Sequence, residues 1–252
     1  MATARALLTV RGMRRTALVT GASRGFGRAL AERLATDGWN VVIDARGPAT
    51  LESARAAIDT AGPGRVVALT GDVEDPVHVA ALVSEAAGLG RFELVVNNAG
   101  ALGPSPLPAV AALRDRDLER VLAANTIAPL RVIQAALPHL RATHGTIVNV
   151  TSDAAVEAYE GWGGYGASKA ALEQLSRVLA AEEAQVRVYV VDPGDMRTQM
   201  HQDAFPGEDI SDRPLPQTRV PGLIRLIDSG LPSGRYHVED VPEPDQVLEP
   251  VQ

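Results

Sequence analysis

The stretch of sequence that decides the fold is Thr20-Gly21-Ala22-Ser23-Arg24-Gly25-Phe26-Gly27, with three glycines in seven residues. The apolar residues 16–19 before it predict a strand, and the apolar spacing over 25–37 predicts a helix. In an open parallel sheet, such a turn lies at the carboxyl end of a strand, where ligands bind. Glycines let the backbone approach a pyrophosphate, and the first N–H groups of the helix attract that anion. The stretch therefore predicts a dinucleotide site more strongly than a plain tight turn.

Short apolar runs alternate with helical stretches along the rest of the chain. Further strands are predicted at 41–43, 66–69, 94–96, 146–150, 186–191 and 236–238, and helices at 50–60, 77–87, 115–124, 129–141, 164–184 and 223–227. Strands that alternate with helices form right-handed βαβ units, which build a parallel sheet covered on both faces. Since no linker interrupts this rhythm, we expect one α/β domain with a doubly wound parallel sheet over residues 16–238.

Three segments depart from the rhythm. Residues 1–15 hold four arginines and no acidic residue, and we expect a flexible N-terminal arm rather than a targeting segment. Residues 199–222 contain four prolines and predict a loop-rich insertion with a short helix. Residues 239–252 are acidic and rich in proline, which predicts a disordered tail.

The composition excludes several kinds of chemistry. The chain has 252 residues and no cysteine, which rules out zinc-thiolate sites, iron–sulfur clusters, disulfides and a cysteine nucleophile. Its five histidines are scattered without ligand spacing, so we expect no metal site. No Lys-Ser or Lys-Thr pair follows the glycines, which argues against a loop for nucleotide hydrolysis.

The charge and hydropathy of the chain limit its partners. A formal net charge of −7 argues against nucleic acid as a main partner. No apolar run approaches the roughly 20 residues of a membrane span, so we expect no membrane partner. The absence of cysteine is compatible with the cytoplasm, which is the location we expect.

The glycine spacing TGxxxGxG resembles that of the classical short-chain dehydrogenase/reductase (SDR) family, and motifs further along the chain match that family in order. Asp72-Val73 follows the third predicted strand and is similar to the pair that contacts the adenine. Asn97-Asn98-Ala99-Gly100 follows the fourth strand and looks like the NNAG motif. Pro193-Gly194 with Thr198 resembles the PGxxxT segment at the nicotinamide end. The resemblance covers about residues 15–200.

The same resemblance extends to the catalytic residues. Tyr165-Gly166-Ala167-Ser168-Lys169 matches the YxxxK motif, and Ser152 lies thirteen residues before the tyrosine, the usual spacing. Asn125 falls where the family places its structural and relay asparagine. The resemblance thus assigns catalysis to Asn125, Ser152, Tyr165 and Lys169.

The resemblance implies a Rossmann-like fold and an NAD(P)-dependent oxidoreductase that moves a hydride between nicotinamide C4 and a small carbonyl or alcohol substrate. It places the substrate loop at 199–222. It assigns the cofactor to Gly21, Ser23, Arg24, Gly25, Phe26, Gly27, Arg46, Asp72, Val73, Asn98, Ala99, Gly100, Tyr165, Lys169, Pro193, Gly194 and Thr198.

The chemistry explains why these residue types are needed. Tyr165 and Lys169 lie four residues apart on a predicted helix and so share one face. A free phenol has a pKa near ~10, and a nearby ammonium favours the phenolate and lowers that pKa. Tyr165 would then exchange a proton with the substrate oxygen, and Ser152 would donate a hydrogen bond to it. Asn125 would hold a water that links Lys169 to solvent.

Lys169 is the only lysine among 24 basic residues. A guanidinium is a flat, bulky fork and does not replace a compact ammonium between a phenol and a ribose. Each residue also has a structural alternative: Lys169 as a surface base, Ser152 as a turn or helix cap, and Asn125 as a satisfied polar group inside a helix. Together with the glycine turn, these alternatives are disfavoured.

The end of the second strand bears on the choice between NADP and NAD. Ala45 stands where NAD-preferring family members usually carry Asp, and Arg46 follows it. Arg24 and Arg46 suit bidentate binding of a 2′-phosphate, so we favour NADP. Two alternatives stay open. A register shift by one residue would present Asp44 to the ribose and favour NAD, and Arg46 would otherwise be a solvated loop charge.

Other functions and assemblies were weighed. A catalytically silent dinucleotide-sensing regulator would typically lose the tyrosine or the lysine, and both are present here. An epimerase or dehydratase of the extended relatives would need a larger substrate domain. No closing Gly-Gly follows residues 233–238, which places a tetramer in doubt, and we expect a homo-oligomer that dimerises through the long helices. Met200, His201, Phe205 and Trp162 are candidates for the substrate pocket or for packing.

Overall fold

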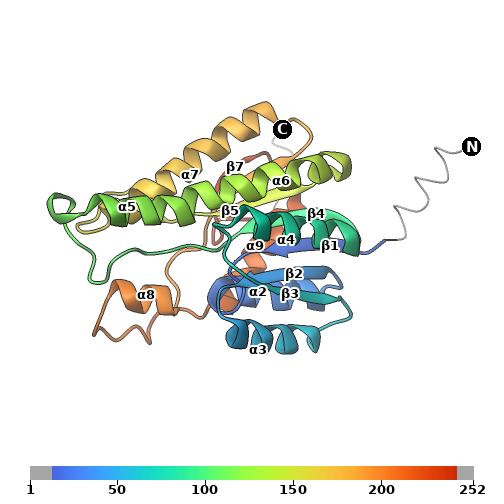
Figure 1. The fold of residues 1–252 in the computed structure, drawn as a ribbon, viewed down its shortest axis with the longest axis horizontal. Coiled ribbons are helices and arrows are strands. Elements are labelled where there is room, and N and C mark those ends of the chain that lie inside the picture. The colour runs from blue at the N-terminus through green and yellow to red at the C-terminus, as the bar shows by residue number, and fades with distance from the viewer. Residues whose placement is uncertain (1–12, 243–252) are drawn as a thin grey trace, which may run out of the picture.

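The computed structural model describes residues 13–242. Most of the predicted arm (1–15) and of the predicted tail (239–252) lies outside the described residues. Within 13–242, one seven-stranded parallel sheet has the order β3-β2-β1-β4-β5-β6-β7 (Figure 1). Its strands are β1 Arg15–Val19, β2 Asn40–Ala45, β3 Val66–Thr70, β4 Arg91–Asn97, β5 Thr146–Val150, β6 Arg187–Asp192 and β7 Gly234–His237.

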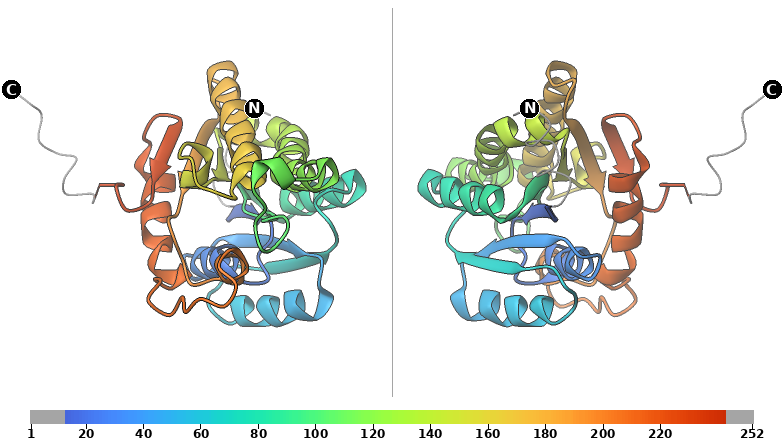
Figure 2. Two further views of the ribbon diagram at one scale, coloured as in Figure 1. Left: turned by 90° about the vertical axis from the view of Figure 1, so that its left-hand side faces the viewer. Right: turned by 90° about the vertical axis from the view of Figure 1, so that its right-hand side faces the viewer.

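Helices cover both faces of this sheet (Figure 2). One face packs against α2 (Gly25–Thr36), α3 (Pro48–Asp59) and α9 (Val220–Ser229). The other packs against α4 (Pro76–Leu89), α6 (Ala128–Thr143) and α7 (Gly163–Glu182), with α5 (Asp115–Leu122) leading into α6. This arrangement confirms the predicted doubly wound α/β fold.

Strand alternation divides the apolar side chains between the two faces. In β1, Ala17 and Val19 face the α2 side and Leu18 faces the α4 side. In β2, Ile43 and Val42 divide in the same way. Successive strand residues point to opposite faces, and here both faces are buried. That is why these strands are continuous apolar runs and not alternating ones.

One pair of predicted helices is continuous in the structure. The predicted helices at 115–124 and 129–141 are joined by a π-helical turn, Ala123–Ile127, into a single helical run. This run, Asp115–Thr143, has the length and composition of a membrane span, although we expected no such run. Half of its apolar window is buried inside the fold, which is typical of a core helix in a globular protein.

The insertion at 199–222 contains the short helix that was predicted. This helix is α8 (Gln199–Ala204), and Thr198 caps it by accepting a hydrogen bond from the N–H of His201. A short 3₁₀ turn and the start of α9 complete the insertion. Figure 1 shows α8 set apart from the sheet and its covering helices. It borders the cleft described next.

Candidate active site

The carboxyl ends of the strands open into a continuous cleft of about 1340 Å³. Of the residues assigned from the sequence, all but Gly27 and Asn125 line this cleft. One end holds Arg46 and Asp72, and the other holds Tyr165 and Thr198. The structure thus brings together motifs that are up to about 180 residues apart in the chain.

The glycine turn at the centre of the cleft has a conformation that other residues rarely adopt. Gly21 has φ +66° and Gly25 has φ +61°. A Cβ atom on Gly21 would lie 2.8 Å from Cα of Ala99, so the turn and the strand-four loop touch through backbone. α2 begins at Gly25, and its N-cap residue Arg24 makes no side-chain capping hydrogen bond. The start of α2 therefore offers backbone N–H groups to an anion in the cleft.

Gly27 has a packing role instead of a direct place in the cleft. A Cβ atom there would lie 2.3 Å from Nδ2 of Asn98. That Nδ2 donates to the carbonyl oxygens of Thr20 (2.9 Å) and Gly21 (3.1 Å). The third glycine leaves room for the asparagine that holds the turn in place.

Asp44 lines the cleft beside the glycine turn but is almost fully buried. It is 1% exposed, its Oδ1 accepts a hydrogen bond of 2.8 Å from the N–H of Gly21, and its Oδ2 lies 3.2 Å from Nε2 of His78. Ala45 ends β2, and Arg46 follows with an exposed side chain that lines the cleft. The Asp44 carboxylate thus supports the glycine turn from below.

Tyr165 and Lys169 are buried one helical turn apart on α7. Nζ of Lys169 donates to the carbonyl oxygen of Val150 (2.9 Å) and lies 5.6 Å from the centre of the Tyr165 ring. Burial lowers the pKa of Lys169 to about 8. Burial raises the pKa of Tyr165, and the charges of Asp192 and Asp153 raise it further.

The raised pKa of Tyr165 is opposite to our expectation that the Lys169 ammonium lowers it. The reason is that burial removes the phenolate from water, and the carboxylates of Asp192 and Asp153 disfavour it further. The phenol is therefore held in its protonated form in this structure.

Ser152 lies at the end of β5 with its hydroxyl already engaged. Its Oγ donates to Oδ1 of Asp153 (2.8 Å) and accepts from the N–H of Ala154 (3.2 Å), so the capping role weighed from the sequence is present here. Oδ2 of Asp153 accepts from the hydroxyl of Tyr159 (3.0 Å). The sequence reasoning missed Asp153, although a charged residue directly after the candidate serine was a visible signal.

Asn125 is fully buried in the π-helical turn. Its Nδ2 donates to the carbonyl oxygen of Ala101 (2.9 Å) and to Oγ of Ser168 (2.9 Å), and its Oδ1 accepts from the N–H of Ala101 (2.7 Å). A Cβ atom on Gly100 would lie 3.1 Å from Oδ1 of Asn125 and 3.7 Å from Nζ of Lys169. The asparagine and the lysine therefore border the same small space.

Aromatic side chains form the wall beside Tyr165. The Trp162 ring packs edge-on against Tyr165 at 5.7 Å and tilted against Phe205 at 6.0 Å. His201 packs on Phe205 at 4.9 Å, and Met200 lines the same part of the cleft. These four candidates for the substrate pocket all border the cleft.

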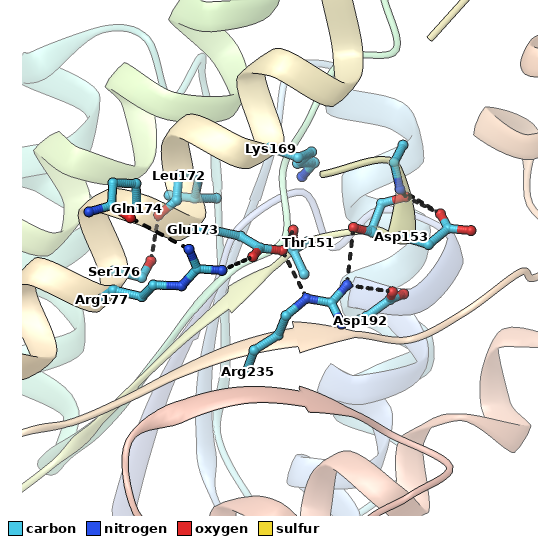
Figure 3. A network of polar contacts seen from close by, with 12 residues as sticks. Thr151, Asp153, Lys169, Leu172, Glu173, Gln174, Ser176, Arg177, Asp192 and Arg235 are labelled. Atoms are coloured by element: carbon cyan, nitrogen blue, oxygen red, sulfur yellow. Dashed lines mark hydrogen bonds and ion pairs between the residues drawn. The ribbon is translucent and has the colours of Figure 1, made fainter. Parts of the chain in front are cut away.

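Behind the site lies a network that the sequence reasoning also missed (Figure 3). It joins Glu173 of α7 and Asp192 of β6 to Arg235 of β7. One signal was visible: Glu173 continues the four-residue spacing of Tyr165 and Lys169 along α7. Among residues 13–242, no group of three or more His, Asp and Glu side chains is placed to hold a metal ion.

Comparison with known proteins gives a consistent result. A family model described as short chain dehydrogenase matches residues 15–209. The short chain dehydrogenase asqE of Emericella nidulans is 40% identical over 178 residues, which are 68% of this chain and 65% of asqE. The chain thus matches just under two thirds of the length of that relative.

Solved structures resemble the whole described fold. A short chain dehydrogenase from Salmonella enterica serovar Typhi has a TM-score of 0.83 at 28% identity, covering 92% of this chain and 98% of that one. An alcohol dehydrogenase from Thermococcus sibiricus, complexed with 5-hydroxy-NADP, has a TM-score of 0.80 at 26% identity, covering 91% and 99%.

Proposed function

The chain belongs to the short-chain dehydrogenase/reductase family and is an NAD(P)-dependent oxidoreductase, and we propose that it uses NADP to interconvert a small carbonyl compound and its alcohol with Tyr165 as acid and base. The observation that carries the proposal is the convergence of Ser152, Tyr165 and Lys169 at one end of the cleft. The cofactor, when bound, supplies or accepts the hydride.

The residues present fit a dinucleotide. The uncapped start of α2 and the two left-handed glycines form an anion site at the middle of the cleft. Asp72 and Val73, assigned to the adenine, and Gly194 and Thr198, assigned to the nicotinamide, all line the cleft. The residues assigned from the sequence are thus distributed along the full length that such a cofactor would occupy.

Two arginines support the preference for NADP. Arg24 and Arg46 both line the cleft, and among the described residues neither forms an ion pair with an acidic side chain. Two free guanidinium groups suit bidentate binding of the 2′-phosphate. Asp44 also lines the cleft, but both its carboxylate oxygens already have partners, Gly21 and His78, which supports the register that assigns the ribose side to Ala45. The bound 5-hydroxy-NADP in the Thermococcus structure is in keeping with this preference.

The raised pKa of Tyr165 defines its part in the reaction. In reduction, the protonated phenol donates its proton to the carbonyl oxygen as the hydride arrives. In oxidation, the phenol must first lose that proton. Ser152 donates a hydrogen bond to the same oxygen once its hydroxyl turns away from Asp153. Lys169 then returns a proton to Tyr165 from solvent through a water that Asn125 would hold in the space they share.

The proposal is tested by fluorescence titration with NADPH and NADH, followed by a panel of carbonyl substrates and of alcohols, with Tyr165→Phe as the control. We expect tighter binding of NADPH, and turnover that the control abolishes. Failure to bind either cofactor would overturn the proposal. Binding without turnover of any substrate would point instead to the dinucleotide-sensing alternative.

We also propose that the protein dimerises through its long helices. Leu175 and Val178 are exposed apolar residues on the outer surface of α7, and Ile127 is exposed on the neighbouring helical run. Apolar side chains of this kind on adjacent helices suit a helix-packed interface. The cytoplasm remains the location that we propose.

A further inference from the structure

Two carboxylates are buried at the candidate active site, and one of them, Asp192, also lines the cleft. Glu173 on α7 is 1% exposed and Asp192 at the end of β6 is 3% exposed. Buried carboxylates are costly unless they are paired with cations and hydrogen bonded. The groups that pair with Glu173 and Asp192 therefore show which segments the fold holds together here.

A single guanidinium joins both carboxylates to the catalytic segment. Nε of Arg235 donates to Oε1 of Glu173 (3.1 Å), and its Nη2 donates to Oδ2 of Asp192 (3.1 Å) and to the carbonyl oxygen of Ser152 (3.4 Å). Figure 3 shows the Arg235 side chain reaching between Glu173 and Asp192. Arg235 lies on β7, the last strand of the sheet, beside Val190 of β6.

Each partner of Arg235 is itself bonded to a functional segment. Oδ1 of Asp192 accepts from the N–H of Gly194 (2.9 Å), inside the segment that meets the nicotinamide. Oε1 of Glu173 accepts from the hydroxyl of Thr151 (2.8 Å), the residue before Ser152. The guanidinium thus connects the serine segment and the nicotinamide segment from behind.

We propose that Arg235 is a positioning residue for the reaction, which holds Ser152 and the Pro193-Gly194 segment in one arrangement and balances the Asp192 charge beside Tyr165. This inference rests on the proposed function. It also gives a role to β7, the last strand of the sheet, on which Arg235 lies.

Glu173 and Asp192 differ in the cationic partners that remain to them when Arg235 is replaced. Glu173 retains Arg177, whose Nη2 lies 2.9 Å from its Oε2. Among residues 13–242, Arg235 is the only cationic partner of Asp192. Loss of the guanidinium therefore leaves the Asp192 carboxylate uncompensated.

The uncompensated charge acts on Tyr165. The charged groups that act on the phenol are Lys169 on α7, Asp192 at the end of β6 and Asp153 after β5. An unbalanced negative charge disfavours the phenolate and raises its pKa. Alcohol oxidation needs the Tyr165 phenolate. Without Arg235, the rate of oxidation would therefore rise at a higher pH than in the wild type.

The test compares Arg235→Met, Arg235→Lys and Arg177→Met in kcat, in KM and in the pH profile of alcohol oxidation. For Arg235→Met we expect a loss of about tenfold to a hundredfold in kcat, the scale of a misplaced catalytic group. We also expect the pH profile of alcohol oxidation to shift to higher pH than in the wild type. Arg235→Lys should restore the pH profile through its charge but only part of kcat.

Arg177→Met is the matched control, because it removes the other guanidinium of Glu173 without touching Ser152 or Asp192. Equal losses in Arg177→Met and Arg235→Met would overturn the proposal, since they would indicate general support of Glu173. Wild-type kcat and pH profile in Arg235→Met would also overturn it. If Arg235→Met does not fold, the test rests on Arg235→Lys. A full kcat in that folded variant would contradict the claim that the guanidinium positions Ser152. A wild-type protein without turnover overturns the proposed function itself. Turnover in the wild type with no effect of the Arg235 variants overturns only the positioning role of Arg235.

Discussion

The hydroxyl of Ser152 donates a 2.8 Å hydrogen bond to the carboxylate of the next residue, Asp153. Asp153 therefore competes with a substrate oxygen for the Ser152 proton. Its charge also raises the pKa of Tyr165. Asp153 thus acts on two of the residues proposed for catalysis without being one of the motif residues.

Replacing Asp153 by Asn should speed alcohol oxidation near neutral pH. Loss of the charge lowers the pKa of Tyr165, so the phenolate forms, and the rate rises, at lower pH than in the wild type. Asp153→Ala should add to this by freeing the Ser152 hydroxyl. The measurement is the pH–rate profile of oxidation. Glu157→Gln, an exposed acid on the same loop, is the control. An unmoved profile in both Asp153 variants would refute the expected coupling.

Replacing Lys169 by Arg should cost about a hundredfold or more in kcat while the fold stays intact. The ammonium sits between the Val150 carbonyl and the space at Gly100, where a flat guanidinium does not fit. Steady-state rates and thermal unfolding are measured on the same preparation. Near-normal turnover in this variant would show that the amine is not used as proposed.

Replacing Arg46 by Ala should weaken NADPH binding on the order of tenfold and leave NADH binding nearly unchanged, because a charge-assisted contact to the 2′-phosphate is lost. Titration of both cofactors checks this. Arg55→Ala is the control, since Arg55 is paired with Glu52 on α3 and does not line the cleft. Equal losses for NADPH and NADH would remove the NADP assignment.

Replacing Gly27 by Ala should destabilise the protein by about 1–3 kcal/mol. The new Cβ would lie 2.3 Å from Nδ2 of Asn98 and displace the side chain that holds the glycine turn. Gly88→Ala on α4 is the matched control, because its Cβ meets nothing within 4 Å. It should stabilise by about 0.5–1 kcal/mol through helix propensity. Denaturant unfolding measures both, and a Gly27 variant as stable as the wild type would contradict the packing described.

Replacing Leu175 and Val178 by Glu should convert the proposed dimer into a monomer, because buried charges at a helix interface are not tolerated without partners. Light scattering after size exclusion gives the mass. Val77→Glu, on an exposed valine of α4, should leave the mass unchanged. A monomeric wild-type protein, or a dimer that survives both charges, argues against this interface.

The parts of the fold that could be predicted depend on local patterns. The strand at 146–150 and the helix that starts at Gly25 were predicted at the residues where they are found, because buried strands and amphipathic helices show their period directly. The continuity of 115–143 was not predicted, since the sequence was interpreted as two separate helices at 115–124 and 129–141. The π-helical turn at Ala123–Ile127 joins these two stretches into one helical run.

The candidate site also has parts that could be predicted from the sequence and parts that could not. Ser152, Tyr165 and Lys169 belong to a motif with a fixed spacing, so they could be named from the sequence alone, whereas Asp153 and Asp192 line the same cleft and belong to no such motif. The contacts of Arg235 with residues 152, 173 and 192 arise only when four separate elements pack together. The direction of the Tyr165 pKa likewise depends on burial by the whole fold, which spacing does not reveal.

The burial of Lys169 has a practical consequence for chemical labelling. It is the only lysine in the chain and is 4% exposed, so the described surface presents no lysine amine to acylating reagents. Because burial lowers its pKa to about 8, a larger fraction of the amine is unprotonated near neutral pH and can react once a small reagent enters the cleft. Peptide mass mapping after brief acylation should therefore report on the occupancy of the cleft through a single modified peptide.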